Sequence, residues 1–159
     1  KVDITMVGNV EKRLSEMGIT LPEAPAPAAN YVPYTIVGNV MTISGQVTMG
    51  PDGLEYVAKL GDTADVAQGQ AAARLCTINI LAQAKAALGD LDRIKQVVKI
   101  QGFVNSTPDF ADHPAVINGA SDFLVAVLGD AGRHARAAVG MASLPFGVAV
   151  EIDAVIEFS

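Results

Sequence analysis

The chain has no tryptophan, one cysteine and few basic residues. A single cysteine excludes an internal disulfide framework and fits a reducing compartment, so we expect a cytoplasmic protein. Its 11 Lys and Arg against 17 Asp and Glu give a net charge of −6. This balance argues against nucleic acid as a partner, because binding to a phosphate backbone needs a basic face.

Long apolar runs and a signal segment are also missing. No run approaches the ~18 apolar residues of a membrane span, and no charged-then-apolar leader opens the chain at Lys1. We therefore expect no membrane partner. Apolar residues make up 50% of the 159 positions but aromatics only 5%, which predicts one domain with a sizeable aliphatic core.

The first residues differ in character from the rest. Residues 9–17 predict a short amphipathic helix in which Val10, Leu14 and Met17 share a face. Residues 21–29 are rich in proline and predict an extended connector. We divide the chain into an N-terminal helix and connector, residues 1–24, and one domain, residues 25–159.

The remaining patterns predict the order βββ-α-β-α-ββ. Gly38-Asn39 is a hairpin signal, and Asp65 is a suitable N-cap for an alanine-rich helix. In chain order we expect strands 34–37, 40–46 and 54–60, a helix 66–88, a strand 97–104, a helix 114–128, and a closing hairpin of strands 135–143 and 148–158. Two helices on one face of a mixed sheet give a two-layer α+β domain. Its bare, partly apolar sheet face suggests self-association.

The last quarter of the chain carries two candidate functional residues. Strand 148–158 alternates between apolar and polar positions, so Glu151 points away from the core, toward solvent or a second subunit. Arg136 lies on the preceding strand, which predicts a guanidinium and a carboxylate one hairpin apart. Arginine can grip a substrate carboxylate at two points, and glutamate can position or deprotonate water. A structural ion pair is the alternative that the residues leave open.

Several motifs occur in a characteristic order. They are Ile43-Ser44-Gly45-Gln46, Phe103-Val104, Asp109-Phe110, Asn118, Ala135-Arg136-x-Ala-Val, Leu144-Pro145 and Val150-Glu151-Ile-x-Ala. This set resembles the YjgF-like family, also called Rid (reactive intermediate imine deaminase) and formerly endoribonuclease L-PSP. The resemblance covers residues 25 to 158. It implies a chorismate-mutase-like fold and a homotrimer with the bare sheet faces inside and clefts between subunits.

The resemblance also implies an activity. Family members hydrolyse small enamines and imines, of the 2-aminoacrylate or 2-iminopropanoate type, to 2-oxo acids and ammonia without a cofactor or metal. Cys76, His113 and His134 have no zinc-like spacing either. A small carboxylate is thus the expected ligand.

Six positions match the family's site. Arg136 would bind the substrate carboxylate and Glu151 would hold the attacking water; the implied pocket is completed by Tyr31, Asn118 and the backbone N–H groups of Gly45 and Ala138. Tyr34 is close enough to Tyr31 to be the relevant tyrosine instead. Tyr31 as a surface aromatic and Asn118 as a simple helix-start residue remain alternatives.

Four features depart from the family pattern. The loop at residues 109–115 is longer, the loop at 129–133 is shorter, Gly140 replaces a commonly acidic or polar residue, and the N-terminal helix is an addition. These changes leave the substrate open. A regulatory trimer that binds a small carboxylate without turnover is the second hypothesis. A ribonuclease or translation inhibitor is the third hypothesis, and the negative net charge of the chain argues against it.

Overall fold

The computed structural model describes residues 8–27 and 29–159, so residues 1–7 of the expected N-terminal segment lie outside the description. The elements are α1 (Asn9–Glu16), β1 (Tyr34–Val37), β2 (Val40–Gln46), β3 (Met49–Gly50), β4 (Gly53–Leu54), α2 (Val66–Leu88), η2 (Leu91–Arg93), β5 (Ile94–Asn105), α3 (His113–Leu128), η3 (Gly129–Gly132), β6 (Ala135–Met141), η4 (Pro145–Gly147) and β7 (Val150–Phe158). The predicted N-terminal helix is confirmed as α1.

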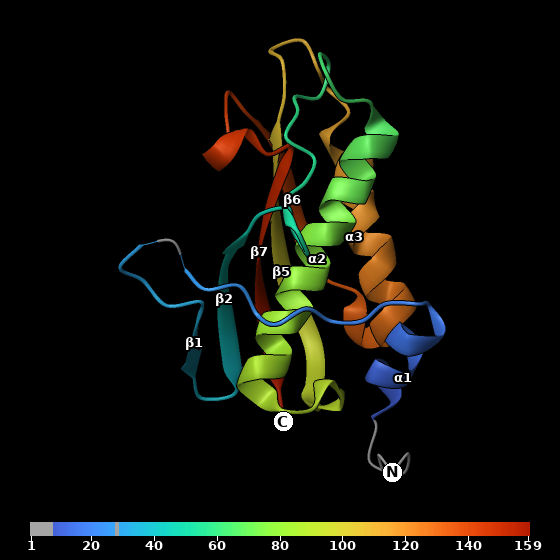
Figure 1. Cartoon of the computed structure of the whole chain (residues 1–159). Coiled ribbons are helices and arrows are strands. Elements are labelled where there is room, and N and C mark those ends of the chain that lie inside the picture. The colour runs from blue at the N-terminus through green and yellow to red at the C-terminus, as the bar shows by residue number, and fades with distance from the viewer. Residues whose placement is uncertain (1–7, 28) are drawn as a thin grey trace.

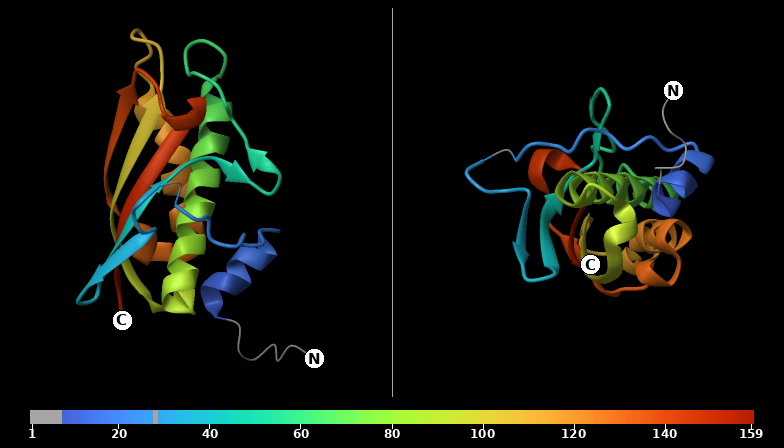
Figure 2. Two further views of the ribbon diagram at one scale, coloured as in Figure 1. Left: turned by 60° about the vertical axis from the view of Figure 1, so that its left-hand side comes forward. Right: turned by 90° about the horizontal axis from the view of Figure 1, so that it is seen from below.

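The main sheet has the strand order β1-β2-β7-β5-β6. All neighbours are antiparallel except β5 and β6, which run parallel. Figures 1 and 2 show α2 and α3 side by side on one face of this sheet, with the other face uncovered. The predicted two-layer α+β fold with a mixed sheet is therefore confirmed.

The predicted closing hairpin is wrong, because β5 lies between β6 and β7. Ala138 of β6 is the parallel partner of Gly102, and Glu151 of β7 is the antiparallel partner of Phe103. A parallel pair needs a long crossover, which α3 provides between β5 and β6. The chain then crosses the end of the sheet through η4 and returns on the other side of β5.

The predicted third strand, residues 54–60, is also wrong. A small separate hairpin forms earlier from β3 and β4, and only isolated bridges follow, at Val57 and Leu60. Tyr56 has a φ of 51°, and this left-handed backbone interrupts the extended conformation that a continuous strand requires.

Helix α2 begins and ends at the predicted residues. Asp65 Oδ1 accepts a hydrogen bond from Gln68 N at 2.8 Å, and Gln68 Oε1 accepts one from Asp65 N at 2.9 Å. This capping box satisfies two N–H groups that would otherwise lack partners. Gly89 follows the helix with a φ of 78°, a conformation that glycine adopts without steric cost.

Helix α3 is apolar because it belongs to the core. Residues His113–Gly132 are long and apolar enough for a membrane span by composition alone, with a mean hydropathy of 1.2. Val116, Ile117, Phe123 and Leu124 are buried against α2 and the sheet. Such a core helix is weak evidence for a membrane protein.

Helix α1 is fastened to the outside of the helix layer. The Asp92 carboxylate accepts hydrogen bonds from Asn9 N and Val10 N at 2.8 and 2.9 Å, which caps the start of α1 from a distant segment. Arg13 Nη1 donates to Val127 O at 2.7 Å. After α1 the chain passes across α2 toward β1 (Figure 1). The connector therefore has a fixed starting point on its way to the sheet.

Gly119 allows the close contact of α2 and α3. A Cβ atom on Gly119 would lie 2.2 Å from Gln70 O, a backbone atom that cannot yield easily. We expect Gly119→Ala to reduce the free energy of unfolding by about 1–3 kcal/mol through overpacking. Helix propensity alone predicts a gain of about 1 kcal/mol, so the sign of the change measured in urea decides between them.

Gly69→Ala is the matched control. A Cβ atom there would meet only side-chain atoms, Val116 Cγ1 at 3.0 Å and Leu60 Cδ1 at 3.1 Å, which can shift. We expect a smaller loss than at Gly119. Equal stability of Gly119→Ala and the wild type would contradict this account of the helix contact.

Candidate functional site

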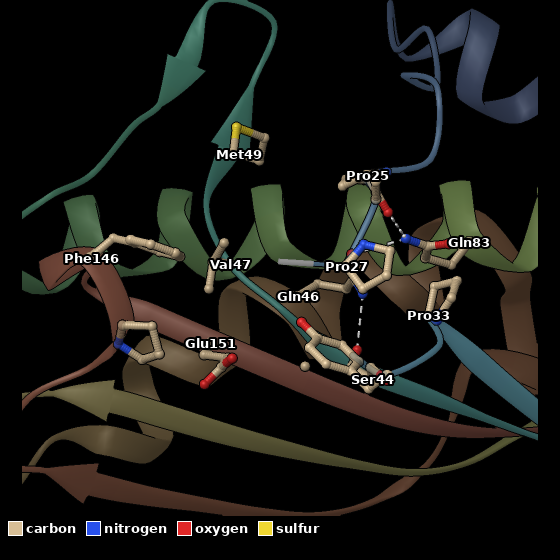
Figure 3. Close-up of a pocket in the computed structure, with 14 residues that line it drawn as sticks. Pro25, Pro27, Pro33, Ser44, Gln46, Val47, Met49, Gln83, Phe146 and Glu151 are labelled. Carbon is tan, nitrogen blue, oxygen red and sulfur yellow. Dashed lines mark hydrogen bonds between the residues drawn. The ribbon is translucent and has the colours of Figure 1, made fainter. Parts of the chain in front are cut away.

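A cavity of about 340 Å³ lies between the connector, β2 and the start of β7. We call it the Glu151 cavity. Its lining residues are Pro25, Ala26, Pro27, Tyr31, Pro33, Ser44, Gly45, Gln46, Val47, Met49, Gln83, Pro145, Phe146 and Glu151. Figure 3 shows Glu151 and Phe146 toward one end of this space and Gln83 toward the other. Most of the wall is apolar, and the few polar groups are concentrated on β2, β7 and α2.

The backbone of β2 approaches Glu151 closely. A Cβ atom on Gly45 would lie 2.7 Å from Glu151 Oε1, so a side chain there would displace the carboxylate from its present position. The register between β2 and β7 shifts between Ile43 and Gln46, which re-aims the strand at this point. Glycine at position 45 thus leaves the carboxylate and the strand backbone facing the same space.

Burial disfavours the charged form of Glu151. Loss of solvent raises the pKa of this half-buried carboxyl, and the nearby Asp153 carboxylate raises it further. Burial likewise raises the pKa of Asp153, although the backbone of Gln101 and the charge of Lys99 oppose the shift. Perturbed carboxyl groups of this kind are concentrated at functional sites.

The described lining of the Glu151 cavity contains no Lys, Arg or His. Glu151 is its one charged side chain. A substrate carboxylate bound here would face a carboxylate with no compensating cation, which is unfavourable in a partly desolvated space. Binding of an anion beside Glu151 therefore needs a positive charge from outside this lining.

Two buried amides hold the cavity wall together. Gln83 Nε2 donates to Pro25 O at 2.7 Å, and Gln46 Nε2 donates to Ser44 O at 3.0 Å. Gln83 is 1% exposed and Gln46 is 6% exposed. The bond to Pro25 ties the connector to α2 over the cavity (Figure 3). Sequence reasoning missed Gln83, although a glutamine amid the alanines of a core helix was an available signal.

Three of the predicted site residues meet in this cavity: Tyr31, Gly45 and Glu151. Tyr31 is 50% exposed and stands at its edge. Tyr34, the alternative tyrosine, instead lines a neighbouring hollow on the sheet face with Thr42 and Asp153. Of the two tyrosines, Tyr31 is therefore the one beside Glu151.

Arg136 lies elsewhere in the subunit. It is the cross-strand partner of Ile100, which is buried under the helices, and directly paired residues project to the same face of a sheet. Arg136 Nη1 donates to Ser121 Oγ at 3.0 Å and Nη2 donates to Pro114 O at 3.3 Å. Glu151 projects from the opposite face, two strands away. The expectation that the two side chains are one hairpin apart is wrong within a subunit.

Asn118 and Ala138 accompany Arg136. Ala138 is two residues along β6 and shares its face. Asn118 is exposed and lies on α3 four residues after Pro114 and three before Ser121, so it shares the helix face that Arg136 contacts. We call Arg136, Ala138 and Asn118 the Arg136 group. The predicted site residues thus lie in two separate groups within the chain.

The chain matches the family model described as "YjgF/chorismate_mutase-like, putative endoribonuclease" over residues 11–153. Among curated proteins it is 48% identical over 159 residues to Protein TCP17 of Trypanosoma cruzi, covering 99% of each chain. It is 30% identical over 138 residues to a 2-iminobutanoate/2-iminopropanoate deaminase of Dermatophagoides farinae, covering 87% of this chain and 93% of the relative.

Solved structures agree. The protein Atu1372 of Agrobacterium tumefaciens, of unknown function, has a TM-score of 0.89 at 53% identity, covering 95% of this chain and 94% of its own. RidA of the Antarctic bacterium Psychrobacter sp. PAMC 21119 has a TM-score of 0.61 at 31% identity, covering 86% and 94%. The fold, the ordered motifs and these matches together show that the chain belongs to the YjgF/chorismate-mutase-like family, which includes imine deaminases.

Proposed function

We propose that the protein hydrolyses small imine or enamine carboxylic acids in clefts between the subunits of a homotrimer. Each cleft would combine the Glu151 cavity of one subunit with the Arg136 group of a neighbour. The observation that carries this proposal is the half-buried Glu151 in a cavity whose described lining offers no cation. A relative named as an imine deaminase supports the reaction class.

A single subunit cannot bring the two halves together. Two strand spacings of about 4.8 Å each separate β6 from β7, and the side chains leave opposite faces. However, β6 is the edge strand, so Arg136 is available to an adjoining molecule. The uncovered sheet face carries exposed Val98 and Val139, each 41% exposed, and such apolar groups favour association.

The chemistry requires little machinery. Arg136 would hold the substrate carboxylate at two points, which fixes the C=N carbon near Glu151. Glu151 would accept a proton from water as the oxygen attacks that carbon. Glu151 returns this proton to nitrogen, the remaining hydroxyl proton follows as the carbon–nitrogen bond breaks, and ammonia and a 2-oxo acid are released. An enamine would first become the imine by moving its N–H proton, through solvent, to its β-carbon. A raised pKa brings the Glu151 carboxyl closer to neutral pH, where a general base also returns its proton readily.

A binding protein without turnover is the second candidate. The departures at residues 109–115 and Gly140 favour it, because they alter the surroundings of the Arg136 group. A ribonuclease role has only the family label behind it, and the net charge of −6 gives RNA no basic face. For either small-molecule function we propose a cytoplasmic location and no cofactor.

Ammonia release tests the reaction. An amino-acid oxidase generates 2-iminopropanoate in the cuvette, and we expect the wild type to accelerate ammonia formation. Arg136→Ala should mainly raise KM, whereas Glu151→Gln should lower kcat by about 100-fold or more. Arg133→Ala is the matched control, since Arg133 is largely exposed and its ion pair is with Asp130.

The same assay separates the two candidates. A saturable carboxylate ligand without ammonia release above background would establish the binding protein and exclude hydrolysis of these substrates. A loss at Arg133→Ala equal to that at Arg136→Ala would show that general charge, rather than the Arg136 group, controls the rate.

Subunit mixing tests the shared cleft. Glu151→Gln and Arg136→Ala subunits, each defective alone, should regain activity when refolded together, because about one quarter of the clefts then carry both native residues. Light scattering should report a trimer at micromolar concentration. A monomeric species with full activity, or mixed subunits without recovery, would place both functional groups outside a shared cleft.

Glu151→Gln should also change the pH dependence of stability. The folded state raises the pKa of Glu151, so it holds that proton more tightly than the unfolded chain does. Well below the ordinary value of about 4.3 both states are protonated and no difference arises. As pH rises through that value and then through the folded pKa, ionised Glu151 increasingly opposes folding.

Replacement by glutamine removes this opposition. We expect the melting temperature of Glu151→Gln relative to the wild type to increase from pH 4 to pH 7. Glu16→Gln, at an exposed position of α1, controls for loss of a negative charge. A difference that stays constant across this range would contradict the raised pKa.

A further inference from the structure

A second cleft lies at the carboxyl ends of the parallel strands β5 and β6. Its volume is about 520 Å³, and its lining residues are Lys59, Ser106, Thr107, Pro108, Phe110, His113, Gly140, Met141 and Ala142. Neither Glu151 nor Arg136 contributes to it. Ligands of sheets with parallel strands commonly bind beyond the carboxyl ends of those strands.

Lys59 is held in place by neutral oxygens. Its Nζ donates to Asn105 Oδ1 at 2.6 Å and to Ala142 O at 2.7 Å, which leaves one of three N–H donors for the cleft. Asn105 is 4% exposed, and its amide nitrogen is directed at backbone carbonyls that include Val148 O at 3.1 Å. Within the described chain, Lys59 has no carboxylate within ion-pair distance. Its positive charge is therefore positioned but not neutralised.

His113 lines the same cleft as Lys59. Its Nε2 lies 3.2 Å from Ser106 Oγ, and Ser106 is 7% exposed. The Phe110 ring meets the imidazole edge-on at a centroid distance of 5.3 Å. One member of this pair donates to the other, so the pair keeps one further hydrogen-bond donor, which the tautomer of His113 assigns to Ser106 or to the imidazole.

Two departures from the family pattern converge here. A Cβ atom on Gly140 would lie 2.4 Å from His113 Nε2 and 2.8 Å from Ser106 Oγ, so the imidazole occupies space that a side chain at position 140 would fill. His113 begins α3 and lies within residues 109–115, the segment expected to be longer than in the family. The absence of a side chain at position 140 thus makes room for the imidazole that residues 109–115 supply.

We propose that this cleft is a binding site for a small oxyanion, a phosphate or a carboxylate group. Lys59 supplies one charged donor and the Ser106–His113 pair supplies one polar donor, and the described lining contains no Asp or Glu. Asp109 and Asp112 belong to the same loop but do not line the cleft. Phe110, Pro108 and Met141 provide an apolar wall for the body of an organic anion. The proposal does not depend on imine hydrolysis, because neither Glu151 nor Arg136 lines this cleft.

The two histidines of the chain allow a direct test. Long-range ¹H–¹⁵N spectra of the imidazoles are recorded on the wild type during separate titrations with inorganic phosphate and with acetate, at constant ionic strength in chloride. The imidazole resonances of His113 should shift saturably with at least one anion. The anion with the lower Kd identifies the ligand chemistry. His134 is bonded to Ser121 Oγ and Gly132 O at 2.9 and 2.6 Å and should not move.

Lys59→Met should weaken the binding about tenfold or more, because it removes a charge-assisted bond. Lys95→Met removes the same charge from an exposed lysine paired with Glu157 and should leave binding unchanged. If Lys59→Met fails to fold, the wild-type titration alone still tests the proposed anion site. No saturable shift of His113 with either anion, parallel shifts of both histidines, or equal weakening by both variants would overturn the proposal.

Discussion

The pairing of β5 with both β6 and β7 is the constraint on which the rest of the molecule depends. Because β5 occupies the position between them, Arg136 and Glu151 are two strands apart on opposite faces. The same insertion makes β6 an edge strand and aligns the carboxyl ends of β5 and β6. The separated site halves and the oxyanion cleft therefore both follow from one choice of strand order.

The two faces of the sheet differ in packing and in charge. The helix-covered face is aliphatic and close-packed, as the contact of Gly119 with Gln70 illustrates. The uncovered face collects Glu151 and Asp153, whose carboxyl pKa values are raised chiefly by burial. Carboxylates in such surroundings reduce stability in the isolated fold, and a function that uses their basicity gives a reason for that arrangement.

The connector after α1 and the segment before α3 line different clefts. Helix α1 is capped by Asp92, and the connector that follows is bonded through Pro25 to Gln83 and forms a wall of the Glu151 cavity. The start of α3 supplies His113 to the cleft at the carboxyl ends of β5 and β6. Segments that flank the regular elements thus determine the lining of both clefts.

The sequence by itself determined the local elements. Asp65 and Gly89 fixed the ends of α2, Gly38-Asn39 fixed the first hairpin, and alternation along β7 put Glu151 on the uncovered face. These features depend on neighbours in sequence, so local chemistry was sufficient. Only the tertiary structure decided the partner of β6, the loss of the strand expected at 54–60 and the placement of Lys59 and His113 in one cleft. Strand pairing joins residues far apart in the chain, and no periodicity within a segment records which partner will lie beside it.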